Sequence, residues 1–194
     1  MTINPPLTIL FLVLGISFTF NSSANNLASD GKLGSSSVGE IPVILQMPQL
    51  VKISALDAVN FTESDVAGSL GGLEKEERFC VYSNSSDAQN TGQYSITFSS
   101  NNLIDGAFAM SSSAGGDSIP YSLNYNQIIP GESTVELVNV PPNRDIPSRG
   151  ANTTSYDCSG QETAYIKVSI TGEALQRAAN GSYSDVLIAT VSTI

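Results

Sequence analysis

Residues 41–53 read Ile-Pro-Val-Ile-Leu-Gln-Met-Pro-Gln-Leu-Val-Lys-Ile. Apolar side chains occupy every second position from Ile41 to Met47, and the same odd-numbered pattern continues after Pro48 at Val51 and Ile53. Alternation with a period of two is typical of β-strands that bury one face. The stretch therefore predicts two strand-like segments that are joined at Pro48.

The rest of the chain repeats this pattern in short pieces separated by polar loops. Further strands are expected over residues 79–82, 94–98, 108–110, 119–125, 135–137, 164–170 and 184–194. The last of these is apolar at both parities, which predicts a strand covered on both faces. One short helix is expected over residues 173–179, ended by Asn180-Gly181. This spacing predicts an all-β fold, a β-sandwich.

Several stretches are expected to lie outside the sheets. The charge run Glu74-Lys75-Glu76-Glu77-Arg78 is interpreted as an exposed loop between strands. Residues 84–92 gather turn-forming side chains and predict a hairpin connection. Residues 141–147 hold three prolines, which lack the N–H group that a sheet needs, so we expect a loop there.

The N-terminus is typical of an exported protein. Residues 7–20 are apolar but too short to cross a bilayer, and Ser22-Ser23-Ala24 supplies the small residues of a cleavage site. We expect a signal peptide over residues 1–24, with an apolar first element of the fold as the alternative. Residues 25–39 are rich in Ser, Gly and Asn and predict a flexible leader. One domain, residues 49–194, follows.

Cys80 and Cys158 are the only cysteines. An even pair in a secreted chain is usually a disulfide. The alternative, a reactive or metal-binding pair, lacks histidine partners and CxxC spacing. The sequence therefore predicts one disulfide and no metal site.

Composition excludes several classes of function. The formal charge is −10 with 8 Lys plus Arg, which disfavours nucleic-acid binding. The chain has no His, so imidazole catalysis is excluded, and neither a GxSxG nor an SxxK motif is present. A pair of catalytic carboxylates needs no motif, but nothing singles two out. We expect no enzyme activity and no cofactor.

The order of these segments resembles the pilin subunits of the bacterial chaperone–usher pathway, especially their archaic and alpha-type branches. Four features carry the resemblance: the alternating segment 41–48 before Leu50-Val51-Lys52-Ile53; Phe79-Cys80-Val81-Tyr82-Ser83-Asn84, with Tyr94-Ser95-Ile96-Thr97 and Ile119-Pro120-Tyr121-Ser122 after it; Cys158-Ser159-Gly160 before the strand at 164–170; and the ending from Gly181 to Leu187 followed by a strand. The ending also resembles spore-coat-U-type secreted domains.

The resemblance implies an immunoglobulin-like sandwich that lacks its last strand. In such pilins a periplasmic chaperone, and then the N-terminal extension of the next subunit, fills the groove that is left. It implies as partners a periplasmic chaperone, an outer-membrane usher, and identical or related pilus subunits. It also implies a route through the periplasm to a cell-surface pilus, with a role in adhesion or biofilm formation.

On this chain the resemblance assigns a donor strand and an acceptor groove. Ile41, Val43, Leu45 and Met47 are the expected donor side chains, and Leu187, Ala189 and Val191 the expected acceptor side chains. Pro42 lacks an N–H and removes one hydrogen bond from such a donor. The alternative is that residues 41–47 form the first strand of their own sandwich, in a secreted monomeric β-sandwich binding module.

Overall fold

The computed structural model describes residues 28–68, 71–87, 90–129, 131 and 138–194. The expected signal peptide and the expected strand at 135–137 lie outside these residues. The elements, in chain order, are β1 (Val51–Ser54), α1 (Glu63–Gly68), β2 (Gly72–Ser83), β3 (Ser86–Asp87), β4 (Asn90–Thr91), β5 (Tyr94–Ser100), β6 (Leu103–Ile104), β7 (Ala107–Ser112), β8 (Ser118–Pro120), β9 (Ser122–Gln127), β10 (Val138–Asn139), β11 (Ile146–Ser148), the 3₁₀-helix η1 (Cys158–Gly160), β12 (Ala164–Thr171), α2 (Gly172–Arg177), β13 (Tyr183–Ser184) and β14 (Leu187–Ser192).

The chain divides into two units, Met1–Gln46 and Met47–Ile194. In the described part of the first unit, two backbone hydrogen bonds join Ser29 and Glu40, with N···O distances of 2.9 and 3.2 Å. Residues 41–47 belong to no strand, and Ile41, Val43 and Leu45 are 80–95% exposed. The second unit holds every strand and helix named above.

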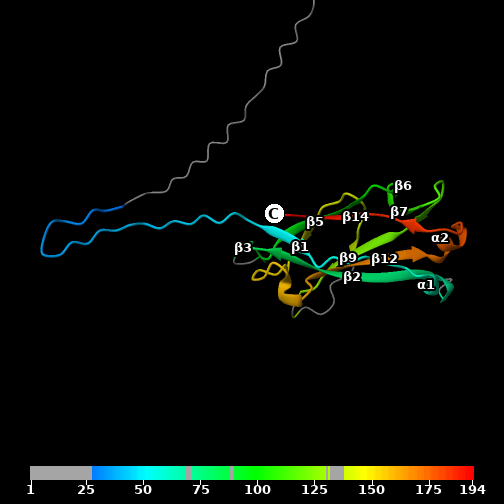
Figure 1. Ribbon diagram of the computed structural model, residues 1–194, viewed down its shortest axis with the longest axis horizontal. Helices are drawn as coiled ribbons and strands as arrows, with labels where there is room; N and C mark the ends of the chain where they lie inside the picture. Colours follow the sequence, from blue (N-terminus) through cyan, green and yellow to red (C-terminus); the bar gives the residue numbers. More distant parts are fainter. Residues whose placement is uncertain (1–27, 69–70, 88–89, 130, 132–137) are drawn as a thin grey trace, which may run out of the picture. The chain divides into compact units, whose positions relative to one another are not determined.

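One layer of the second unit is an antiparallel sheet in the order β1-β2-β12-β9-β10. Strand β12 is central, because it pairs with β2 from Ala164↔Phe79 to Thr171↔Gly72 and with β9 from Ala164↔Gln127 to Ser169↔Ser122. Figure 1 shows β2, β12 and β9 running side by side along the domain. This layer carries most of the predicted alternation.

The opposite layer is built around β5, which pairs with β11 on one edge and with β14 on the other. Strand β7 pairs with β6, β8 and β13 in a second small sheet. Within the described residues, no helix is long and apolar enough to cross a membrane. The protein is thus an all-β sandwich, as the sequence predicted.

Alternate side chains of the two layers meet in one core. Phe98 of β5 packs against Tyr125 of β9 with ring centroids 5.7 Å apart, and Tyr94 and Tyr125 share a hydrogen bond of 2.6 Å between their hydroxyl groups. Both tyrosines are at most 1% exposed, so the shared bond satisfies hydroxyls that would otherwise be buried without a partner.

The predicted disulfide is confirmed. Cys80 of β2 is bonded to Cys158 of η1, with their Cα atoms 5.8 Å apart. Both residues are 1% exposed. The bond ties the start of the η1–β12 connection to the central sheet.

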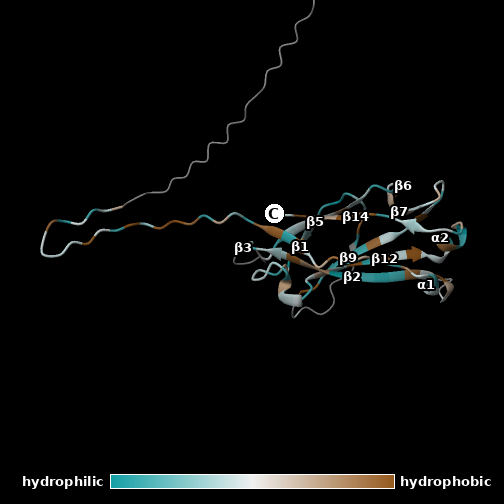
Figure 2. Cartoon of the chain, in the orientation of Figure 1, coloured by the Kyte–Doolittle hydropathy of each residue, from teal (hydrophilic) through white to brown (hydrophobic). Residues whose placement is uncertain are grey.

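Several sequence expectations were wrong in detail. The charge run 74–78 is not a loop: it forms the first half of β2, coloured as hydrophilic in Figure 2, where Glu74 and Lys167 form an ion pair of 3.2 Å on the outer face of the sheet. The expected loop 141–147 ends in an edge strand, since Pro147 lies in β11. Residues 84–92 were expected to join the strands on either side into a hairpin, but β2 and β5 belong to different sheets, and the small hairpin β3–β4 lies between them. The expected strand 119–125 is two strands, divided at Tyr121. The expected helix is confirmed as α2.

Replacing both cysteines, as Cys80→Ala with Cys158→Ala, is expected to lower the free energy of unfolding by about 4–5 kcal/mol, because the bond closes a 78-residue loop in the unfolded chain. Urea unfolding followed by circular dichroism measures the difference. As a control, a reductant should destabilise the natural chain and leave the double variant unchanged. A loss below about 1 kcal/mol would contradict the role given to the bond.

Candidate functional site

Strand β14 has one partnered edge and one open edge. It pairs with β5 from Leu187↔Ser100 to Ser192↔Ser95, and no described strand pairs with its other edge. Its burial alternates: Leu187, Ala189 and Val191 are half-buried and pack against the core, whereas Ile188 is 44% exposed. Val186, just before the strand, is 68% exposed. The expectation that this segment is covered on both faces was therefore wrong.

The strand order leaves the position beside β14 without a described strand. In an immunoglobulin-like sandwich one sheet has the order A-B-E-D and the other has C-F-G. Strands β1, β2, β12 and β9 follow the first order, and β5 and β14 occupy the places of C and F. No described strand occupies the place of G, next to β14.

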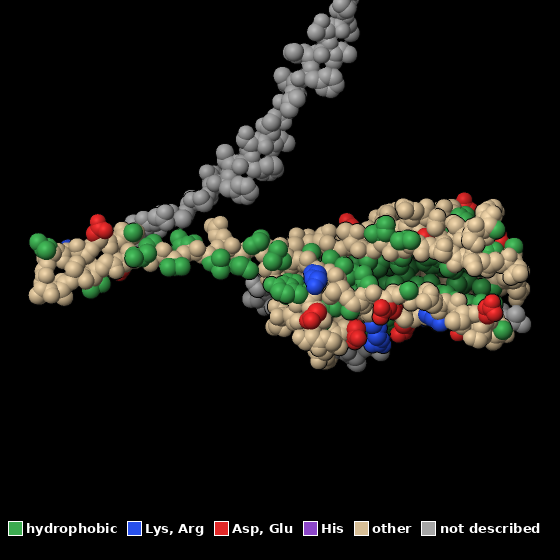
Figure 3. Space-filling model, viewed as in Figure 1, with side chains coloured by type: hydrophobic (Ala, Val, Ile, Leu, Met, Phe, Trp, Pro, Cys, Tyr) green, Lys and Arg blue, Asp and Glu red, His purple; other side chains and the backbone are tan. Residues whose placement is uncertain are grey.

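A groove of about 440 Å³ lies where that strand would close the sandwich. Its floor is the core itself, with Phe79, Phe98, Ile166 and Val168 among the lining side chains. Figure 3 shows it as a hollow lined by hydrophobic side chains along one face of the domain. The groove brings together Leu187 and Ala189, two of the three expected acceptor residues, while Val191 packs against the core.

One wall of the groove is the segment between β1 and α1, residues 56–61. The chain leaves the sheet at Ala55, whose φ of 58° lies in the left-handed region that a residue with a Cβ rarely adopts. Beyond it, Asp57 N donates a hydrogen bond of 2.7 Å to Glu77 Oε1 on β2. Val59 and Phe61 pack against the core and so hold the wall in place.

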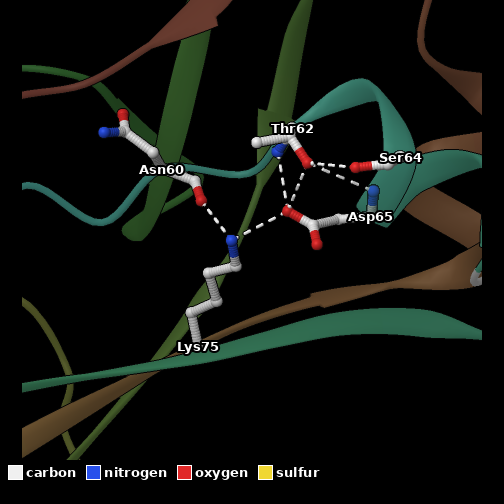
Figure 4. Close-up of polar contacts among 5 residues, drawn as sticks. All are labelled: Asn60, Thr62, Ser64, Asp65 and Lys75. Atoms are coloured by element: carbon white, nitrogen blue, oxygen red, sulfur yellow. Dashed lines mark hydrogen bonds and ion pairs between the residues drawn. The ribbon is translucent and has the colours of Figure 1, made fainter.

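Lys75 of β2 fastens the far end of this wall (Figure 4). Its Nζ donates to the backbone oxygen of Asn60 at 2.5 Å and to Asp65 Oδ2 at 2.8 Å, and it lies 5.6 Å from the centre of the Phe61 ring. Asp65 Oδ2 also accepts a hydrogen bond of 2.7 Å from Thr62 N. This bond caps the N-terminus of α1. The hydrogen bond from Lys75, followed by those from Thr62, lowers the pKa of Asp65 to about 2.

The opposite wall comes from residues 183–187 and 189, and Asp185 holds it in place. The Asp185 carboxylate accepts hydrogen bonds from Ser100 Oγ at 2.7 and 2.8 Å, from Asn102 Nδ2 at 3.0 Å and from Tyr121 OH at 2.6 Å. Burial, and then this bond to Asp185, raise the pKa of Tyr121. The bonds anchor the chain immediately before β14 and keep its open edge beside the groove.

Tyr183 is held at the same end by Asp117. Its hydroxyl donates to Asp117 Oδ2 at 2.5 Å, and Ala179 N donates to the same oxygen at 2.9 Å. The hydrogen bond from Tyr183 is the main cause of a lowered pKa at Asp117. Among the described residues no group of His, Cys, Asp or Glu side chains could hold a metal ion.

The groove therefore presents apolar surface and the unpaired backbone edge of β14.

Sequence reasoning did not find the first wall or its anchors. Val59 and Phe61 continue the odd-numbered parity of Val51 and Ile53, so the alternation was a signal that could have marked this segment. Lys75, Glu77 and Asp185 carry no local pattern, because their roles depend on partners 10 to 85 residues away. The expected donor side chains are all exposed: Ile41 88%, Val43 95%, Leu45 80% and Met47 66%.

No protein-family model matches the chain, and no curated protein matches it. Among solved structures, the chain is similar to one chain of a structure described as "Chaperone-tip adhesin complex is vital for synergistic activation of CFA/I fimbriae biogenesis". The two are 14% identical with a TM-score of 0.48, over 73% of this chain and 41% of that one. This chain thus spans about two fifths of that neighbour, and a similarity of this size says nothing about function.

Asp65→Asn is expected to destabilise the domain in a pH-dependent way. The folded state lowers the pKa of this carboxyl from 3.8 to about 2, so its contribution to stability is present above the unfolded value and is lost as the pH falls through about 2. Unfolding free energies of the natural and variant chains, measured between about pH 6 and pH 2, should differ by a constant amount down to about pH 5 and converge below it.

The control for that measurement is Glu63→Gln in the same helix, because Glu63 forms no ion pair among the described residues. The difference in unfolding free energy between Glu63→Gln and the natural chain should not follow this pH profile. A gap between natural and Asp65→Asn chains that persists unchanged to pH 2 would contradict the role assigned to the Lys75–Asp65 contact.

Proposed function

We propose that this protein is a structural subunit of a surface fibre, in which residues 41–47 of one copy enter the groove of the next. The observation that carries the proposal is the open edge of β14 above an apolar groove. An unpaired strand edge is a template for another strand, and proteins normally cover or blunt it. Addition of an extended segment to such an edge is an established mode of recognition.

The proposed occupant matches the groove in length and in pattern. Residues 41–47 place four apolar side chains on one face, and β14 spans six residues, Leu187–Ser192. Buried together, the four side chains would contribute roughly 6–12 kcal/mol before the cost of ordering the segment. The exposed fraction of Ile41, Val43 and Leu45, 80% or more, leaves them available to a second copy.

Pro42 restricts which edge of the entering strand can pair with β14. In an extended strand, the N–H and C=O groups of one residue point to the same side, and those of the next residue point to the other. If the backbone N–H and C=O groups of the odd-numbered residues point toward β14, those of the even-numbered residues point away from it. Pro42, which has no N–H, then lies with its backbone toward the free edge, where a proline is tolerated. Only one of the two strand directions, parallel or antiparallel to β14, also turns the odd-numbered side chains into the groove.

Such a joint is heterologous, because the donor segment and the groove are different surfaces. Head-to-tail contacts that do not close into a ring form a filament. Before assembly the same exposed edge needs protection, and a chaperone strand that covers β14 in the periplasm would supply it. Adhesion or biofilm formation at the cell surface then follows as the role of the fibre.

The alternation provides matched variants that test the joint. Val43→Asp and Ala189→Arg each place a charge in the proposed apolar contact between the donor segment and the groove. We expect the assembled fraction of chains to fall at least about tenfold, because an unpaired buried charge costs several kcal/mol. Ile44→Asp and Ile188→Arg change the neighbouring residue on the opposite face and should assemble like the natural chain. Sedimentation and negative-stain electron microscopy measure the polymer.

Each variant is first compared with the natural chain by circular dichroism and by formation of the Cys80–Cys158 bond, so that misfolding is separated from loss of the joint. Assembly of Val43→Asp at the natural level would refute the proposal. So would a natural chain that stays monomeric and unfolds cooperatively, and the secreted monomeric binding module would then replace the fibre subunit.

A further inference from the structure

The side chain of Asn84 joins the end of β2 to the residues just before β1. Its Oδ1 accepts a hydrogen bond of 2.6 Å from Leu50 N, and its Nδ2 donates one of 2.9 Å to the backbone oxygen of Pro48. The Asn84 backbone N–H also donates to Leu50 O at 3.1 Å. All of these residues belong to the unit Met47–Ile194.

This pattern requires an extended backbone at residues 48–50. A side-chain amide presents one donor and one acceptor side by side, as a peptide group does. The C=O of one residue and the N–H of the second residue after it face the same partner when the chain between them is extended, as in a parallel pair of strands. Asn84 therefore acts on Pro48 and Leu50 as a neighbouring strand would.

Pro48 adds a second restraint at the same point. A proline disfavours the helical region for the residue before it and so keeps Met47 extended. Together with Asn84 it carries the chain through residues 47–50 without a turn, in line with β1, whose Val51 pairs with Ser83 next to Asn84.

The groove lies in the other direction along the chain. Its first wall, residues 56–61, begins after the last residue of β1, whereas residues 48–50 precede the first. To enter the groove of the same chain, residues 41–47 would have to reverse at 48–50 and run back past the four residues of β1, about 13 Å.

We propose that Asn84 is a positioning residue: by holding residues 48–50 extended it prevents residues 41–47 from entering their own groove and directs them to a second copy of the chain. The inference rests on the proposed function, and it adds the reason why the segment is used between copies. Each of the two side-chain hydrogen bonds is worth about three- to tenfold in a conformational equilibrium. Their loss should shift the balance toward the intramolecular arrangement by about tenfold or more.

Disulfide trapping tests this in the full chain. Two pairs of substitutions each place one thiol on the donor and one in the groove. The first pair is Leu45→Cys with Ala189→Cys, and the second, which tests another register, is Val43→Cys with Ala189→Cys. Electrophoresis without reductant then separates chains crosslinked to a second copy from chains crosslinked internally. With Asn84 present we expect crosslinks between copies. With Asn84→Ala the internal product should rise about tenfold or more relative to them.

Controls separate positioning from folding. Asn124→Ala removes an asparagine from β9 and should leave the ratio unchanged. A peptide of residues 39–48 should bind Asn84→Ala and natural chains equally, because the groove itself is not altered. An unchanged ratio in Asn84→Ala, with the natural chain still crosslinked between copies, would overturn the role of Asn84 and leave the fibre joint intact. Absence of both crosslinks in the natural chain would overturn the joint and this inference together.

Discussion

The unpaired edge of β14 is the constraint on which the rest of this structure depends. Backbone N–H and C=O groups at a sheet edge need partners when apolar surface surrounds them. Here the edge runs along a groove whose floor is the core of the sandwich, with Phe79 and Phe98 among its lining residues. An extended segment satisfies both needs at once, because its backbone pairs with the edge while every second side chain fills the groove.

The groove is kept open by polar contacts on both walls. On one side Glu77 and Lys75 hold the segment 56–61 by its backbone, at Asp57 N and Asn60 O. On the other side Asp185, just before β14, accepts hydrogen bonds from hydroxyl and amide groups. These contacts hold each wall in place without a closing strand between them. The side chain of Asn84 likewise takes the place of a neighbouring strand, because it forms hydrogen bonds with the backbone of Pro48 and Leu50.

The sequence predicted what depends on local periodicity and failed where distant partners decide. Alternation located β5 and β12, an apolar run located β14, and the two cysteines predicted their bond. It could not show that the charged residues 74–78 form a strand, because their strand character comes from pairing with β12 about 90 residues away, with Glu74 opposite Ser169. Nor could it show that β14 is exposed on one face, since apolar residues at both parities look the same whether or not a second layer covers them.

The central claim is that the free edge of β14 is unpaired in the single chain and paired in the assembled form. Amide hydrogen exchange, read residue by residue over β14, measures this most directly. The account predicts that alternate amides of Leu187–Ser192, those turned toward β5, are protected in the monomer, while the remaining ones exchange rapidly and become protected on assembly. Equal protection of both sets in the monomer would contradict it.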